Sequence, residues 1–250
     1  MKALDLPATG EVPVVTAAQM AEIDRVAVDE IGISVEMLME NAARGVALAA
    51  RALLGGSVDG RRIVCVAGSG NNGGDALGAA RRLRGWGARV RCVLSVARDD
   101  LHGDLNKRQL DIARRAGIDV APAAGARLEE ADLIVDGLLG YSVRGAPHGT
   151  VAALIAAANA SGVPVLAVDL PSGLHPDTGA PLGAAVRAAA TVTLGLPKAG
   201  LLRPVARPFV GQLLLADIAV PPHAYDRFGI DARGVFVAGD LVRVATAERS

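Results

Sequence analysis

Short runs of aliphatic residues alternate along the chain with longer stretches in which apolar residues recur every three or four positions. The short runs are typical of strands buried on both faces of a sheet, and the longer stretches are typical of helices that cover it. The pattern therefore predicts an α/β protein with a mostly parallel sheet between layers of helices. We expect strands at 63–67, 89–96, 131–139, 164–170, 191–196 and 212–218, and helices around 77–83, 103–116 and 149–160.

Two further helices are expected before the first strand, although a plain doubly wound sheet needs none there. The first begins at a capping-box pattern, Thr16 with Gln19, and stops at Gly32. The second begins after Ser34 as N-cap and closes at the glycine pair 55–56. We expect these helices either to cover one face of the sheet or to form a contact between subunits.

Length and pattern together indicate a single domain of 250 residues with weakly patterned ends. Residues 1–14 are expected to form a flexible arm, and residues 226–250 a peripheral tail. Hydrophobic residues make up 51% of the chain but aromatic residues only 2%, so the core must consist of aliphatic side chains and closely approaching backbones.

The charge balance excludes functions that depend on long-range electrostatic attraction. The chain has 26 Lys and Arg residues and 26 Asp and Glu residues, so neither nucleic acid nor an anionic membrane is an expected partner. Cys65 and Cys92 lie in expected buried strands, which favours free thiols in a reducing compartment. Residues 1–13 lack the features of a signal peptide, and no uncharged run reaches the ~18 residues that span a bilayer, so we expect a cytoplasmic protein.

The segment 67–75, with the sequence AGSGNNGGD, joins the first expected strand directly to a helix. Its Gly-x-Gly-x-x-Gly spacing allows backbone N–H groups to approach a phosphate, because glycine permits positive φ and has no Cβ. An ordinary NAD-dependent dehydrogenase also needs an acidic residue at the end of the second strand, where this chain has Ser95, Val96 and Ala97. A dehydrogenase is therefore disfavoured, and the glycines alone leave open both nucleotide binding and a tight turn.

Polar side chains gather where expected strands end, which is the edge at which such sheets bind ligands. Asp136 and Asp169 each follow an apolar run, and Asn72 and Ser172 lie close to other strand ends. Asn72, Asp136 and Ser172 offer oxygen atoms that suit an alkali or alkaline-earth cation better than zinc. The alternative for each carboxylate is a turn or cap residue. Lys198 follows a later strand and is expected to be solvated, with a phosphate contact as the alternative.

Several motifs, in this order along the chain, resemble those of the NAD(P)H-hydrate epimerase family. The motifs are NNGGD at 71–75, VDGLLG at 135–140, DLPSG at 169–173 and LPK at 196–198. Residues 20–24 and 38–43, in the helices expected before the first strand, are similar to that family's N-terminal helices. The resemblance covers residues 15–220, and the NNGGD loop is its most specific part.

The resemblance implies a Rossmann-like three-layer αβα sandwich and an isomerase that interconverts the R and S epimers at C6 of NADHX and NADPHX, the hydrated nicotinamide cofactors. It implies one potassium ion per subunit, held by Asn72, Asp136 and Ser172. We expect Asp169 to contact the hydrated ring and to act as catalytic acid and base. The implied substrate-binding residues are Asn71, Asn72, Gly73, Gly74, Asp75, Gly140, Tyr141, Ser142, Val143, Arg144, Gly145, Ala146 and Asp169.

The family also implies a metabolic partner, because an ADP- or ATP-dependent dehydratase acts on the S epimer. Bacterial relatives are often fused to that enzyme, whereas 250 residues leave no room for it, so we expect a separate dehydratase. A homodimer formed through the N-terminal helices is a further expectation. The competing hypothesis is a non-catalytic nucleotide-binding or scaffold relative, which the joint presence of Asn72, Asp136, Asp169 and Ser172 disfavours.

Overall fold

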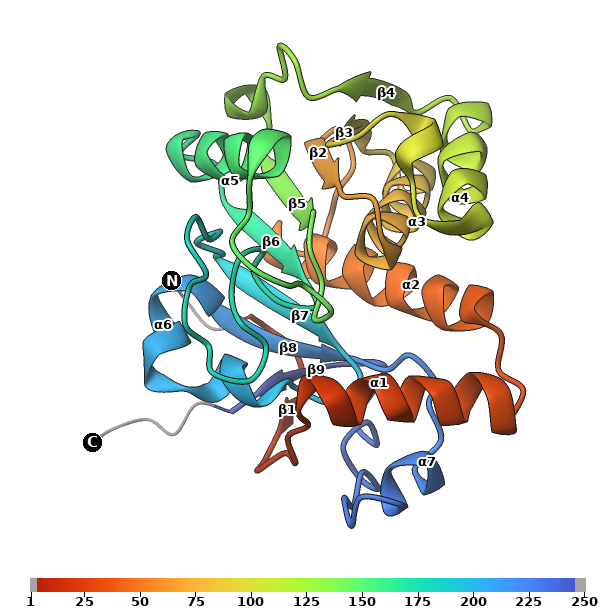
Figure 1. Cartoon of the computed structure of the whole chain (residues 1–250). Coiled ribbons are helices and arrows are strands. Elements are labelled where there is room, and N and C mark those ends of the chain that lie inside the picture. Colours follow the sequence, from red (N-terminus) through yellow and green to blue (C-terminus); the bar gives the residue numbers. More distant parts are fainter. Residues whose placement is uncertain (1–3, 246–250) are drawn as a thin grey trace.

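The computed structural model describes residues 4–245, and nine strands within this range form one sheet. The strand order is β1-β9-β8-β7-β6-β5-β2-β3-β4, and every neighbouring pair is parallel except β8 with β9. The prediction of a mostly parallel sheet is therefore confirmed (Figure 1). The strands are β1 (Ala8–Thr9), β2 (Arg62–Ala67), β3 (Arg89–Leu94), β4 (Asp119–Pro122), β5 (Leu133–Gly137), β6 (Val165–Val168), β7 (Ala190–Leu194), β8 (Gln212–Ala216) and β9 (Leu241–Val244).

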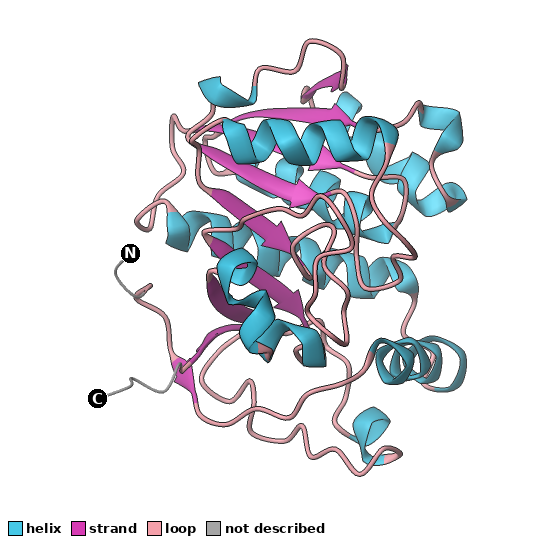
Figure 2. Cartoon of the chain, turned by 60° about the vertical axis from the view of Figure 1, so that its left-hand side comes forward, coloured by secondary structure: helices cyan, strands magenta, loops and turns pink. Residues whose placement is uncertain are grey.

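Helices cover both faces of the sheet, which gives the expected three layers (Figures 1 and 2). Successive side chains of a strand point to opposite faces, so in β2 Ile63 and Cys65 pack in one buried cluster with residues of α2, α3 and α4, whereas Val64 and Val66 pack in another with residues of α5. None of the helices described between residues 4 and 245 is both long and apolar enough to cross a membrane. The helices are α1 (Ala17–Arg25), α2 (Val35–Leu53), α3 (Asn71–Gly85), α4 (Gly103–Arg115), α5 (Gly149–Ala160), α6 (Arg207–Val210) and α7 (His223–Asp226).

The two N-terminal helices begin where their capping residues predict. Thr16 Oγ1 accepts a hydrogen bond from the N–H of Gln19 at 3.1 Å, and Gln19 Oε1 accepts one from the N–H of Thr16 at 2.8 Å. Ser34 caps α2 through a similar bond to a backbone N–H group. α2 then packs against α3 and against β6, β7, β8 and β9. It therefore covers one face of the sheet, which is the first of the two arrangements expected for these helices.

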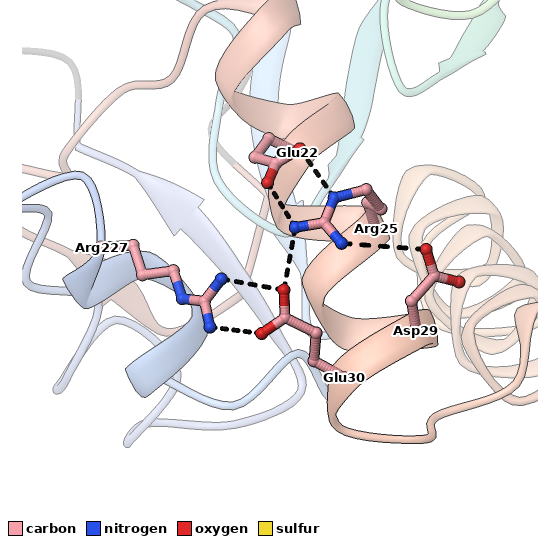
Figure 3. A network of polar contacts seen from close by, with 5 residues as sticks. All are labelled: Glu22, Arg25, Asp29, Glu30 and Arg227. Carbon is pink, nitrogen blue, oxygen red and sulfur yellow. Dashed lines mark hydrogen bonds and ion pairs between the residues drawn. The ribbon is translucent and has the colours of Figure 1, made fainter.

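α1 continues into a π-helical turn, Val26–Glu30, which the sequence pattern does not distinguish from an α-helix. Figure 3 shows a network of ion pairs on the exposed side of this segment, and Arg227 beyond α7 joins it through Glu30. Exposed pairs of this kind contribute little stability each, and it is the pair of Arg227 with Glu30 that joins the π-helical turn to the segment after α7. The other pairs join Arg25 to Glu22, Asp29 and Glu30.

The described parts of the N-terminal arm and the C-terminal tail each contribute a strand, which the sequence pattern did not predict. β1 pairs with β9 in parallel register, and β9 pairs with β8, so both ends of the chain contribute strands to one edge of the sheet. Val12 is 8% exposed, Leu241 is 6% exposed and Val242 is fully buried. Strands of two and four residues are too short to show a periodic pattern, which is why they were not expected. Residues 1–3 and 246–250 lie outside the described range.

Candidate active site

A cavity of about 460 Å³, here called the crevice, opens at the carboxyl ends of β2, β5, β6 and β7. The chain runs outward from β2 to β3 and β4 and then returns to β5 on the other side of β2, and ligands bind at such a reversal. Met20, Val28 and Leu38 of the N-terminal helical segments line the crevice with apolar groups. The predicted substrate-binding residues that line it are Asn71, Asn72, Asp75, Gly140, Tyr141, Ser142, Val143, Arg144 and Asp169.

Two glycines of the loop, Gly68 and Gly73, lie too close to neighbouring backbone to carry a side chain. A Cβ atom at Gly68 would lie 1.8 Å from the carbonyl oxygen of Leu138, and one at Gly73 would lie 2.2 Å from the carbonyl oxygen of Gly68. None of the glycines between 68 and 74 has positive φ, so Gly68 and Gly73 are needed for their missing Cβ and not for the expected backbone freedom. Gly74 likewise makes room for neighbouring side chains. Gly73 and Gly74 are not among the residues that line the crevice, and their place in the substrate-binding set stays a prediction.

Gly145 and Ala146, the last two residues of the predicted binding loop, are not among the residues that line the crevice. Their place in the substrate-binding set stays a prediction. Asn71, by contrast, lines the crevice, and its Oδ1 accepts a hydrogen bond from Asn106 of α4 at 3.2 Å. Asn106 also donates to the carbonyl oxygen of His102 at 2.7 Å, so α4 orients the start of the NNGGD motif.

The structure brings Asn72, Asp136 and Ser172 together around the peptide of Leu139. Asp136 accepts hydrogen bonds from Ser172 Oγ at 2.7 Å and from the N–H of Ser172 at 2.9 Å. Ser172 Oγ accepts one from the N–H of Leu139 at 2.9 Å. The Asn72 amide nitrogen donates to the carbonyl oxygens of Leu139 at 2.9 Å and Val168 at 3.2 Å. Burial raises the pKa of Asp136 to about 6, while hydrogen bonds from Ser172 and Leu138 oppose that rise.

Asp169 lies directly after β6 and forms a buried ion pair with Lys198, which follows β7. The lysine is 1% exposed, so the expectation of a solvated lysine is wrong. Its ammonium also donates to the carbonyl oxygen of Leu194 at 3.1 Å. The chain on both sides of Lys198 is bonded to Val15, by N–H to carbonyl bonds of 3.0 and 2.8 Å, and this pairing turns the lysine inward.

Two further groups in the crevice are Asp24 of α1 and its partner Tyr141. The tyrosine hydroxyl donates to Asp24 Oδ2 at 2.6 Å, and burial raises the pKa of both groups. The Lys198 ammonium lies 5.4 Å from the centre of the Tyr141 ring. Asp24 was not predicted to be a site residue, although the sequence contains one indication of it. Asp24 follows Met20 by four positions and precedes Ala27 by three, so it lies on the same face of the helix as these two apolar residues.

Comparison with known proteins identifies the group to which this site belongs. Residues 35–200 match the family described as YjeF-related protein N-terminus. A protein of Dehalogenimonas lykanthroporepellens named NAD(P)H-hydrate epimerase is 40% identical over 236 residues, which are 94% of each chain. The chain belongs to the NAD(P)H-hydrate epimerase family. The resemblance inferred from the motifs is therefore confirmed.

Other members of the epimerase family differ in length. A protein of Limosilactobacillus fermentum, also named NAD(P)H-hydrate epimerase, is 39% identical over 204 residues, which are 81% of this chain and 95% of that protein. A protein of Moorella thermoacetica named bifunctional NAD(P)H-hydrate repair enzyme is 39% identical, but this chain spans only 40% of its length. The crystal structure of a yeast protein covers 93% of this chain with a TM-score of 0.80 and 22% identity, which shows the shared fold.

Proposed function

We propose that this protein is an NAD(P)H-hydrate epimerase, which interconverts the R and S forms of NADHX and NADPHX at C6 of the hydrated ring. The observation that carries the proposal is the ion pair of Asp169 and Lys198 in the crevice, beside the NNGGD loop. Relatives named for this activity match 94% and 81% of the chain, and the matches span 94% and 95% of their own lengths. A non-catalytic relative would have no need for a buried carboxylate and ammonium in an open crevice.

The chemistry requires a group that moves a proton at the C6 hydroxyl. This hydroxyl is on a carbon bonded to the ring nitrogen, so the nitrogen lone pair assists the departure of water. Return of water to the other face of C6 inverts the centre. Proton transfer by a positioned carboxyl group contributes ~10² to 10⁴-fold to such a step. Asp169, which lines the crevice and is held in place by Lys198, is the proposed acid and base.

We place the dinucleotide along 71–75 and 140–146. The first segment includes the start of α3, where free N–H groups and the helix dipole favour a phosphate. In the second, Arg144 and Ser142 line the crevice and supply a positive charge and a hydroxyl.

We also propose one potassium ion per subunit, held by Asn72, Asp136 and Ser172. The side chains suit an alkali cation, because they offer a buried carboxylate, a hydroxyl and an amide and no sulfur or imidazole. Asn72 directs its amide nitrogen at the carbonyl oxygens of Leu139 and Val168, so its side chain would have to rotate to present the oxygen to a cation. A bound cation would offset the charge of Asp136, which has no surface exposed to solvent.

The proposed metabolic partner is a separate ADP- or ATP-dependent dehydratase that consumes the S epimer. The bifunctional names of several longer relatives support this pairing. A homodimer and a location in the cytoplasm stay predictions.

The test is to incubate the protein with R-NADHX and a dehydratase specific for the S epimer. Recovery of NADH should be accelerated well above the rate with the dehydratase alone. Asp169→Asn should reduce this acceleration by ~10² to 10⁴-fold, and Asp99→Asn, at a side chain that is 91% exposed, should not change it. An unchanged rate with the parent protein would remove the proposed activity, and a fully active Asp169→Asn variant would remove Asp169 from this role.

A further inference from the structure

Asp75 is a carboxyl group in the crevice to which the mechanism above gives no chemical role. It lies in the second turn of α3, is 6% exposed and lines the crevice. Among residues 4–245, no side chain or backbone group forms a hydrogen bond or ion pair with its carboxyl group. A buried carboxyl without partners is costly in its ionised form and is found where it has a task.

Asp75 and Asp169 line the same crevice but come from different elements. Asp75 belongs to the helix that follows β2, and Asp169 directly follows β6. β5 lies between these two strands in the sheet, and α3 packs over its end, since a Cβ atom at Gly137 would lie 2.6 Å from the Cβ atom of Ala76. A ring seated over the end of β5, beside Leu138 and Gly140, would lie in the same crevice as both carboxyl groups, and inversion at C6 requires proton transfer on both faces of the ring.

The charges around the crevice favour different states for the two groups. Lys198 forms its ion pair with Asp169 and not with Asp75. Burial, followed by the charges of Asp169 and Asp24, raises the pKa of Asp75 well above its ordinary value, and Lys198 opposes this only in part. The remaining ionisable groups that line the crevice are His102, Tyr141 and Arg144, and Glu40 of the adjacent α2 is paired with Arg81 and Arg82.

We propose that Asp75 is a second catalytic residue of the epimerase reaction and acts on the ring face opposite to the one served by Asp169. The inference rests on the proposed function and specifies how both faces of C6 are served. Asp169, which is paired with the Lys198 ammonium, acts first as the base, and Asp75, which has no cationic partner, acts first as the acid. The two carboxyl groups then exchange these roles with each inversion.

The proton and electron balance of the step is closed. Asp75 donates its proton to the C6 hydroxyl of the epimer that faces it, the C6–O bond breaks with its electrons on oxygen, and the nitrogen lone pair forms a C6=N1 bond. A water molecule on the side of Asp169 then bonds to C6, the C6=N1 electrons return to nitrogen, and the water's proton passes to Asp169. The reverse reaction starts from the protonated Asp169, and no oxidant or further reactant is needed.

Oxygen exchange separates this role from a structural one. Each epimer is labelled with ¹⁸O at the C6 hydroxyl and incubated in ordinary water. The samples contain the parent protein, Asp75→Asn or the exposed control Asp99→Asn. The rates of label loss and of inversion are corrected for the reaction without protein. The parent and the control should lose one label with each inversion. Asp75→Asn should invert at least ~10²-fold more slowly, while the epimer that faces Asp169 still loses its label without inverting.

Two results would overturn the assignment. Inversion by Asp75→Asn within about threefold of the parent would show that one carboxyl group serves both faces. If Asp75→Asn slowed oxygen exchange and inversion by the same factor, and did so for both epimers, Asp75 would have a structural role. If the parent protein does not epimerise at all, the proposed function itself fails, and that outcome is recognised before any variant is measured.

Thermal unfolding across pH provides a second test that does not depend on activity. A raised pKa in the folded protein means that the folded state binds more protons than the unfolded state, so the burial of Asp75 lowers stability as pH rises above the ordinary Asp value. Asp75→Asn removes that effect and should melt at a higher temperature than the parent at neutral pH, with the difference vanishing below about pH 4. A variant that is less stable at neutral pH would show that Asp75 is ionised and held by partners.

Discussion

A lysine with 1% of its surface exposed requires a compensating charge, and Asp169 supplies it to Lys198. Asp169 itself has φ of 66°, a left-handed conformation that costs a residue other than glycine about 1–3 kcal/mol. Strain of this kind persists only where the surrounding structure holds it, and it concentrates at functional sites. The conformation and the ion pair together show that the surrounding structure holds Asp169 in place.

Removal of the ammonium should reveal this dependence. Lys198→Met leaves a buried carboxylate without its partner, so the free energy of unfolding should fall by about 3–5 kcal/mol. The double variant Asp169→Asn with Lys198→Met removes both charges and should recover most of the loss. Urea unfolding of the single and double variants measures the coupling, and simple addition of the two single effects would contradict it.

At the scale of elements, the crevice depends on how closely α3 follows β2 and approaches β5. The strand, the glycine spacing and the polar ends of neighbouring strands could be predicted from the sequence, because each is a local pattern of a few residues. The contact between Gly68 and Leu138 could not, since 70 positions separate them and nothing local indicates which strand lies beside the loop. Asp24 and Lys198 were missed as site residues for the same reason.

Gly68→Ala should therefore be damaging although the backbone conformation permits alanine. The new Cβ would meet the carbonyl oxygen of Leu138, so we expect the loop to move, activity to be lost and stability to fall by about 2–4 kcal/mol. Gly85→Ala at the other end of α3 has open space and should be neutral or raise stability by up to ~1 kcal/mol. Thermal unfolding and the coupled NADH assay measure both variants. Equal effects at the two positions would show that close approach is not the reason for glycine.

At the scale of the whole molecule, the crevice joins five segments that are far apart along the chain. α1, α3 and the ends of β5, β6 and β7 each contribute at least one polar side chain. The oxygen cluster of Asn72, Asp136 and Ser172 links three of these segments beneath the crevice. A ligand bound there would stabilise the assembled fold, because the unfolded chain does not keep these groups together.

Potassium should accordingly raise the unfolding temperature. At a hundredfold excess over its dissociation constant, a ligand specific for the folded state adds about 2.7 kcal/mol. Differential scanning fluorimetry in potassium chloride and in choline chloride at equal ionic strength measures the effect, and Asp136→Asn should abolish it. Equal unfolding temperatures of the parent protein in the two salts, up to molar concentration, would argue against the proposed cation.

Hydrophobic periodicity and short motifs were sufficient for the α/β class, the central strands, the capped helices and the family, since these follow from side chains within a few residues of one another. The two edge strands at the chain ends are stabilised by pairing with each other and with β8, and so they have no local signature. The charge states in the crevice likewise depend on which side chains are buried together. Lys198, Asp24 and Asp75 acquire their roles from neighbours that only the folded sheet brings within reach.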